Sequence, residues 1–254
     1  MRLQRLNMDN SWHLALGGLR LLIDPWLEGV EFDYFKWFNT QWHRTAPLPY
    51  PSVPTADAVL ITQKYQDHCH PPTLQRLQPK HILAPSSLQR HLTRIVPAAK
   101  VYSMDAHNPV VRFRGVSVHH LPTRRRVDPI YDAFALDDGT ISVVLAPHGF
   151  ALDDGHRTSI EGMSPCGLLI APFDHYRLPT LLGGVVSPGL PSLQRLCDVL
   201  DPTYIARAHD EDKHARGLVR HLARIRRFDK RSLKDYPWLA TRWLQIRDYT
   251  PVDL

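Results

Sequence analysis

One stretch of nine residues, 62–70, does most to limit what this chain can fold into. It follows the apolar run 58–61 (Ala-Val-Leu-Ile), which predicts a buried strand, and it precedes 71–74 (Pro-Pro-Thr-Leu), which predicts the start of a short helix. Between them lie Asp67 and His68. A carboxylate and an imidazole near a strand end can converge on one divalent ion. The stretch therefore predicts a strand–loop–helix unit that carries metal ligands.

The pattern of helices and strands in the rest of the chain predicts an α/β protein with mixed sheets. Residues 12–16 and 19–23 flank a Gly-Gly turn and predict a β-hairpin. Helices are predicted at 73–77, 86–95 (with Ser86 or Ser87 as the N-cap), 192–200 and 214–228. Further strands are predicted at 81–84, 101–104, 110–113, 116–121, 131–136, 140–145, 166–171 and 203–208.

Composition excludes several classes of protein. With 254 residues and 43% apolar content, the chain is long enough for one large domain or two small ones, with a real core. No apolar run approaches the roughly 20 residues of a membrane span, and residues 1–5 lack the apolar region of a signal peptide. The three cysteines are few and far apart, which favours a reducing, cytoplasmic setting. The net charge of +6 suits an anionic substrate or surface and is too small to imply nucleic-acid binding by itself.

The stretch 63–68 resembles the His-x-His-x-Asp-His signature of the metallo-β-lactamase superfamily with its first half rewritten. Gln63 and Tyr65 stand at the first two histidine positions, and Asp67 and His68 at those of the second metal site. The run 24–27 (Asp-Pro-Trp-Leu) is similar to the branch that includes ascorbate-phosphate lactonase. The resemblance implies one domain over 1–254, an αββα sandwich of two mixed sheets flanked by helices. Residues 28–54 are rich in aromatic residues and proline, which predicts a lid-like insertion.

The resemblance also implies which later residues are metal ligands. Where the family has its third first-site histidine, this chain has 123–126 (Thr-Arg-Arg-Arg), and a guanidinium cannot ligate a cation. His148, in Pro-His-Gly, stands at the position of the family's second-site aspartate, and His209 follows a late strand. The implied ligands of a single divalent ion are Asp67, His68, His148 and His209. Zinc is the expected metal, with iron or manganese as alternatives.

Each of these residues also has a plain structural interpretation. Asp67 could instead cap the helix that begins near Pro71, and the three histidines could be structural or solvated. Tyr65 could donate a proton to a leaving group or pack as an aromatic ring. Asp174 and His175 could border the substrate or form a surface turn. Arg124 and Arg125 could attract an anion or form a solvated turn.

The resulting hypothesis is a single-metal hydrolase of a small anionic ester, lactone or phosphodiester. Asp67 and Tyr65 are the expected catalytic residues, and Arg124, Arg125, Asp174 and His175 the expected substrate-binding ones. The alternative is a non-catalytic member of the fold that binds a metabolite or a partner. A third hypothesis, nucleic-acid binding, depends on arginines at helical spacing in 214–228, a pattern more typical of a solvated face; these are Arg216, Arg220, Arg224 and Arg227. The sequence does not indicate the oligomeric state.

Overall fold

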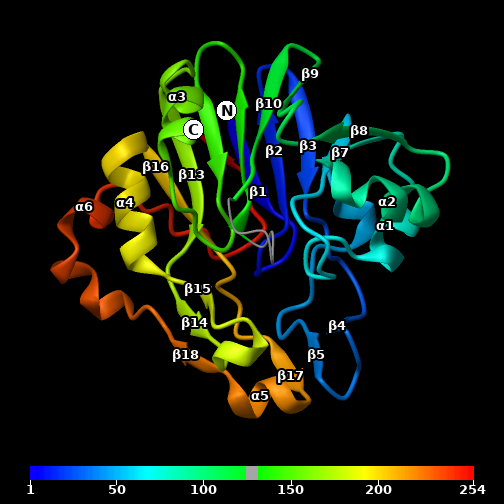
Figure 1. Cartoon of the computed structure of the whole chain (residues 1–254), viewed down its shortest axis with the longest axis vertical. Helices are drawn as coiled ribbons and strands as arrows, with labels where there is room; N and C mark the ends of the chain where they lie inside the picture. The colour runs from blue at the N-terminus through cyan, green and yellow to red at the C-terminus, as the bar shows by residue number, and fades with distance from the viewer. Residues whose placement is uncertain (124–130) are drawn as a thin grey trace. The chain divides into compact units, whose positions relative to one another are not determined.

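The computed structural model describes residues 1–123 and 131–254, which cluster into two compact units (Figure 1). The first unit contains Met1–His120, Glu211–His221 and Ile246–Leu254. The second contains Leu121–Asp210 and Leu222–Gln245. A single domain over the whole chain stays a prediction.

The first unit is built on a seven-stranded mixed sheet in the order β19-β1-β2-β3-β6-β7-β8. Neighbours from β19 to β3 are antiparallel, and those from β3 to β8 are parallel. Its strands are β1 (Arg2–Arg5), β2 (Trp12–Leu16), β3 (Leu19–Ile23), β6 (Ala58–Leu60), β7 (His81–Pro85), β8 (Lys100–Met104) and β19 (Val252–Asp253).

Local sequence explains the central part of this sheet. The predicted hairpin is confirmed as β2 and β3, joined by Gly17 and Gly18, which both have the positive φ that a tight turn needs. All three residues of β6 are buried, as a parallel strand covered on both faces requires. Because β3 and β6 are parallel neighbours, the loops that follow them leave the same edge of the sheet.

Helices α1 (Pro71–Leu77) and α2 (Gln89–Ile95) lie beside the β7–β8 edge (Figure 1). The N-cap of α1 is His70, not Asp67: the His70 ring accepts a hydrogen bond from the backbone N–H of Thr73. Burial lowers the pKa of His70 to about 4, which keeps its ring neutral and able to accept. The predicted serine cap of the next helix is wrong, because a 3₁₀ turn, η2 (Ser86–Leu88), precedes α2.

The predicted insertion 28–54 contains two strands and a short 3₁₀ turn rather than a bare loop. Strands β4 (Val30–Asp33) and β5 (Asn39–Trp42) form a hairpin, and β17 (His214–Arg216) pairs with β5; η1 (Tyr50–Ser52) follows. Its role as a lid stays a prediction. A further hairpin of the first unit joins β9 (Val110–Phe113) to β10 (Val116–Leu121).

The second unit carries strands of the other large mixed sheet, with β16, β13, β12 and β11 as successive neighbours. The pair β11–β12 is antiparallel, whereas β12, β13 and β16 are parallel. These strands are β11 (Ala133–Asp137), β12 (Ser142–Leu145), β13 (Cys166–Pro172) and β16 (Tyr204–Ala208). Every residue of β13 is buried, as its central place between two parallel partners requires.

Helices and a small sheet complete the second unit. Helix α4 (Leu190–Leu200) packs on β13, and its apolar face joins the core cluster there (Figure 1). The other elements are α3 (Asp154–Glu161), α6 (Pro237–Ala240), the turns η4 (Thr180–Leu182) and η5 (Lys230–Asp235), and the sheet β15-β14-β18. That sheet consists of β14 (His175–Arg177), β15 (Val185–Ser187) and β18 (Arg224–Arg226). The α/β class with two large mixed sheets is thus confirmed.

The predicted helix 214–228 is wrong. That stretch forms β17, the short helix α5 (Leu218–Leu222) and β18 instead. Gly217 interrupts it with a φ of 101°, and a Cβ there would lie 2.6 Å from the Phe38 carbonyl oxygen. The two flanking strands find partners far away in sequence, β5 for β17 and β14 for β18. The four arginines therefore do not share one helical face.

The sequence also carries expectations about membrane-spanning helices and the three cysteines, and the structure describes both features. Among the described residues, no helix is long and apolar enough to cross a membrane. Cys69, Cys166 and Cys197 are all free and buried, and burial raises the pKa of each thiol to about 12. These thiols are therefore core residues in this structure.

The buried core of the second unit predicts a clear difference between two leucines. Leu169 in β13 is fully buried, whereas Leu181 in η4 is 99% exposed. Leu169→Ala should lower the free energy of unfolding by about 2–5 kcal/mol, because it removes core contacts and leaves a cavity. Leu181→Ala should change it by no more than about 0.5 kcal/mol. Urea unfolding followed by circular dichroism measures both, and equal losses would contradict the assigned core.

Candidate metal centre

A buried carboxylate, Asp24, organises the loop that follows β6. Asp24 lies directly after β3, and its carboxylate accepts the backbone N–H of Thr62 at 2.8 Å and the Thr62 hydroxyl at 2.6 Å. It also accepts Nδ1–H of His68 at 2.7 Å. The Asp24 and His68 side chains are both fully buried. Three short donors on one desolvated carboxylate fix the loop to the neighbouring strand end.

This contact decides which ring nitrogen of His68 can bind a metal. Because Nδ1 carries the proton given to Asp24, Nε2 is the atom that can act as ligand. A carboxylate behind a histidine is the usual outer partner of a metal-bound imidazole, where it sets the tautomer and raises the basicity of the ligand.

The spacing of Asp67 and His68 fits a shared ion. His68 Nε2 lies 3.8 Å from Asp67 Oδ2. Two ligands at the usual zinc distances of about 2.0–2.2 Å lie roughly 3–4 Å from each other. Both residues belong to the first unit, and the Asp67 side chain is 13% exposed, so the pair is nearly buried.

The same carboxylates control the charge of His68. Burial by itself lowers the pKa of His68, but the charges of Asp67 and Asp24 and the hydrogen bond to Asp24 outweigh it and raise the pKa to about 9. The surroundings of this ring therefore favour a positive charge on it. A divalent ion at Nε2 would supply that charge in place of the proton.

Asp67 has a second cationic neighbour, Lys213, whose Nζ lies 3.7 Å from Asp67 Oδ2. Burial lowers the pKa of Lys213, but the carboxylates of Asp9, Glu31 and Asp67 outweigh burial and hold that pKa well above its usual value. Burial and the charge of Asp67 raise the pKa of Glu31 well above its usual value, although Lys213 opposes the shift. Lys213 is thus an ammonium ion beside a candidate ligand.

In the second unit, His148 and His209 lie together. His148 follows β12 and His209 follows β16, and the centroids of the two rings are 4.6 Å apart. Strands β12 and β16 both run parallel to β13, so their carboxyl ends meet at one edge of the sheet. Two adjacent imidazoles at strand ends form a nitrogen donor pair suited to a transition metal.

The backbone around these histidines is specialised. Gly149 follows His148 with a φ of 82°, and a Cβ there would lie 3.0 Å from Ser192 Oγ. His209 itself adopts a φ of 50°, a conformation that non-glycine residues rarely take. Such strain costs about 1–3 kcal/mol and clusters at functional sites.

The other residues proposed from sequence lie as follows. Tyr65 is half-buried, and its carbonyl oxygen accepts the N–H of His68 and of Cys69, which tightens the loop. Gln63 is buried. Arg124 and Arg125 lie outside the described residues. Their predicted roles, and that of Tyr65 in catalysis, stay predictions.

Asp174 is buried rather than part of a surface turn. Its carboxylate accepts hydrogen bonds from Arg207 at 2.5 Å, from Arg227 at 3.2 Å and from the backbone N–H of Phe228 at 2.7 Å. This gives Asp174 a structural role in the second unit. His175 belongs to β14, where it pairs with Arg226. Contact of Asp174 or His175 with a substrate stays a prediction.

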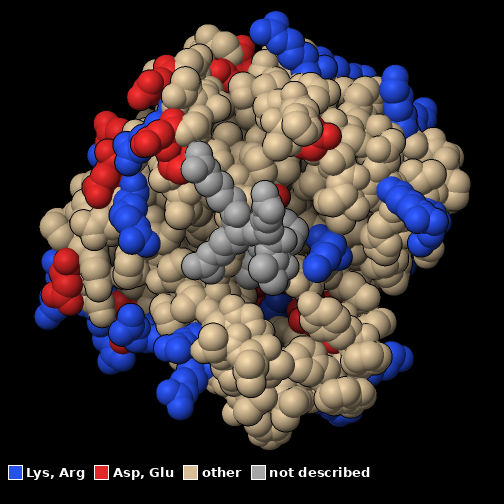
Figure 2. All heavy atoms as spheres, viewed as in Figure 1, with Lys and Arg blue, Asp and Glu red and all other residues tan. Residues whose placement is uncertain are grey.

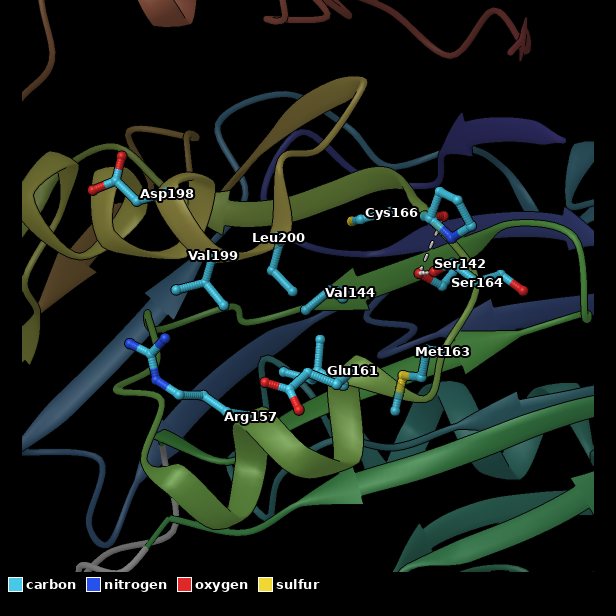
Figure 3. Close-up of a pocket in the computed structure, with 12 residues that line it drawn as sticks. Ser142, Val144, Arg157, Glu161, Met163, Ser164, Cys166, Asp198, Val199 and Leu200 are labelled. Atoms are coloured by element: carbon cyan, nitrogen blue, oxygen red, sulfur yellow. Dashed lines mark hydrogen bonds between the residues drawn. The ribbon is translucent and has the colours of Figure 1, made fainter.

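A pocket in the second unit lies away from the histidine pair (Figure 3). It has a volume of about 390 Å³ and is lined by residues of α3, by the end of α4 and by Ser142 and Cys166. Those two residues begin β12 and β13, whereas His148 follows the opposite end of β12. Binding sites of parallel strands lie at the carboxyl ends. This pocket is therefore separate from the strand end that carries His148.

Comparison with known families decides the identity of the fold. The model of the β-lactamase superfamily domain matches residues 7–209, a range that includes Asp67, His68, His148 and His209. The chain belongs to the metallo-β-lactamase superfamily. The predicted fold class is confirmed by this match, and the protein is hydrolase-like in the coarse sense that its superfamily implies. No curated protein matches the sequence.

Solved structures agree on the fold at low sequence identity. An isothiocyanate hydrolase from Delia radicum gut bacteria is 16% identical, with a TM-score of 0.69 over 100% of this chain and 99% of that one. The metallo-β-lactamase fold protein YhfI from Bacillus subtilis is 11% identical, with a TM-score of 0.63 over 99% of both chains. Zn²⁺-bound PqqB from Methylobacterium extorquens is 13% identical, with a TM-score of 0.57 over 100% of both chains.

Sequence reasoning missed two residues of this region, Asp24 and Lys213. Asp24 carries a local signal, since an Asp directly after an apolar strand can reach the loop of a neighbouring parallel strand. Lys213 carries none, because its partners Asp9 and Glu31 lie 204 and 182 positions away.

The structure predicts a graded loss when the Asp24 contacts are removed. Asp24→Ala should cost about 3–5 kcal/mol of unfolding free energy, because it removes one buried partner of His68 and leaves the donors of Thr62 and the Nδ1–H of His68 without their acceptor. Thr62→Val removes only the hydroxyl donor and should cost about 1.5–3 kcal/mol. Urea unfolding of chelator-treated protein measures both. A smaller loss for Asp24→Ala than for Thr62→Val would overturn the central place given to Asp24.

Proposed function

We propose that the protein is a metal-dependent hydrolase that uses one divalent ion, held by Asp67, His68, His148 and His209. The proposal joins the two pairs described above into one ligand set, with one ligand atom from each side chain. One carboxylate and three imidazoles suit zinc, with iron or manganese as alternatives. The observation that carries the proposal is the buried Asp24–His68 contact, which aims Nε2 of His68 beside Asp67.

We propose one ion and not two because of the residues at the positions of the superfamily's first metal site. Gln63 and Tyr65 stand where the superfamily signature has its first two histidines, and neither offers strong ligation. Asp67, His68, His148 and His209 correspond to the second site alone. We therefore propose a mononuclear centre in place of the usual two-metal arrangement.

When bound, a divalent ion in such a site supplies Lewis acidity and makes water a stronger acid near neutral pH. Asp67, as a carboxylate beside Nε2 of His68, orients the attacking water by accepting a hydrogen bond. Tyr65 donates the phenolic proton to the leaving oxygen. Asp24 keeps the His68 ring in one tautomer throughout.

The proposed substrate is a small anionic ester, lactone or phosphodiester. The net charge of +6 supports an anion, and the Asp-Pro-Trp-Leu run supports the lactonase-like branch. One structurally similar protein is an isothiocyanate hydrolase, so an isothiocyanate belongs in the same screen.

Two other functions remain as outcomes of the tests. A non-catalytic member of the fold would bind a metabolite with the same residues and turn nothing over. Nucleic-acid binding loses its sequence argument, because the four arginines do not share a helix. Among the described residues, the Lys and Arg side chains on the face that Figure 2 shows lie in separate groups.

The ligand set predicts metal content directly. Tag-free wild-type protein should bind one zinc ion per chain. His209→Ala should weaken binding by more than about 100-fold, since loss of an outer partner alone costs about 10–100-fold. The exposed His107 is the matched control, and His107→Ala should bind zinc like the wild type. Elemental analysis and competition with a chelator measure these values, with circular dichroism to check the fold.

Two tightly bound ions per chain would contradict the mononuclear proposal. Activity is tested by a screen of esters, lactones, phosphodiesters and an isothiocyanate with metal-loaded protein. Hydrolysis should be lost in His209→Ala and kept in His107→Ala. Equal background rates for the wild type and His209→Ala would favour the non-catalytic alternative.

The role of Tyr65 makes a separate prediction. Tyr65→Phe should leave zinc binding unchanged and lower kcat by about 10²–10⁴-fold, the usual contribution of a positioned proton donor. Tyr102→Phe, in β8, is the control and should leave kcat unchanged. If Tyr65→Phe keeps full turnover, the ring is a packing residue and the proton comes from another group.

A further inference from the structure

Lys213 is a nearly buried cation, with only 12% of its side chain exposed. The chain just before it is firmly anchored: Glu211 accepts the backbone N–H groups of Arg44 and Thr45, and its carboxylate bonds to His43 at 2.6 Å. These contacts fix the backbone close to Lys213 within the first unit, so the start of the lysine side chain has a defined position.

The surroundings of the Lys213 ammonium are those of a cation site. Nζ lies 3.1 Å from Asp9 Oδ2, 3.3 Å from Glu31 Oε1 and 3.7 Å from Asp67 Oδ2. The Asp9 and Glu31 side chains are 1% and 3% exposed. The ring of Trp26 faces the ammonium at 5.2 Å. Carboxylate oxygens from separate segments are the ligands that hard divalent cations take in proteins.

We propose that the ammonium of Lys213 is the resident cation of a carboxylate site formed by Asp9, Glu31 and Asp67. In this proposal the ammonium supplies a fixed positive charge beside Asp67. In a superfamily member with two ions, the second metal ion would supply a positive charge near this aspartate. The link to Asp67 as a metal ligand rests on the proposed function, whereas the carboxylate site itself stands on the distances above.

Charge and not packing is the basis of this role. Burying a lysine among three carboxylates carries a desolvation cost. A cluster of apolar side chains of similar volume would fill the same space without that cost, so packing alone does not explain these charged residues. Removal of the ammonium alone takes away the cation that lies against the buried carboxyl groups of Asp9 and Glu31. Lys213→Met should therefore lower Tm by roughly 6–20 °C, although it keeps most of the side-chain volume.

The decisive variant is Lys213→Ala, which opens space between the three carboxylates. We combine it with His148→Ala and His209→Ala, so that the proposed histidine ligands cannot hold the probe. The probes are Mn²⁺, followed by electron paramagnetic resonance, and propylammonium, followed by thermal unfolding. Each replaces the lost charge in a different chemical form.

The histidine double variant that keeps Lys213 should bind no Mn²⁺ at submillimolar concentration. Adding Lys213→Ala should create one Mn²⁺ site per chain, and either probe should restore most of the lost Tm. Lys213→Met in the same background should respond to neither probe, because the methionine fills the space.

A further pair of variants covers the case in which Lys213→Ala does not fold. Lys213→Met with Asp9→Asn should recover part of the Tm lost in Lys213→Met, since it removes one of the buried negative charges beside the former ammonium. No recovery there, or a folded Lys213→Ala that gains neither Mn²⁺ nor stability with the amine, overturns the proposal. Zinc binding by otherwise wild-type protein reports on the proposed hydrolase separately, so the two failures are distinguishable.

Discussion

The arrangement of the candidate site depends on the buried carboxylate of Asp24. It receives both donors of Thr62 and the Nδ1–H of His68, and so ties the loop after β6 to the end of β3. Because the two strands are parallel neighbours, one carboxylate at this edge reaches the next loop without distortion of the sheet. The orientation of His68, the choice of its ligand atom and its distance from Asp67 all follow from this contact.

The protein keeps side chains at positions where glycine would relieve the backbone. Asp24 and His209 both have positive φ, 47° and 50°, at an estimated cost of about 1–3 kcal/mol each. Asp24 directly follows strand β3, and His209 directly follows strand β16. The same conformation occurs at the helix C-caps Gln78 and Asp201, so it is the contacts of the Asp24 and His209 side chains, and not the backbone alone, that distinguish these two positions.

Local signals made the hairpin and most strands predictable from sequence, through apolar runs and the Gly-Gly turn. The strand–loop–helix unit drew attention to Asp67 and His68, whereas the sandwich fold and the choice of His148 and His209 came from the resemblance to the metallo-β-lactamase superfamily. The helix predicted at 214–228 failed because its segments pair with strands more than 40 positions away, which no local pattern reports. Lys213 was missed for the same reason, since its charge is compensated by residues near the other end of the chain.

The central claim is that one divalent ion is held by Asp67, His68, His148 and His209. Anomalous X-ray diffraction from zinc-loaded crystals at the zinc edge tests it most directly. One peak per chain is expected, with His68 Nε2 at about 2.0–2.1 Å from the ion, an oxygen of Asp67 at about 2.0–2.2 Å, and both other histidines as ligands. A peak ligated elsewhere, or His148 and His209 turned away from the ion, would contradict it.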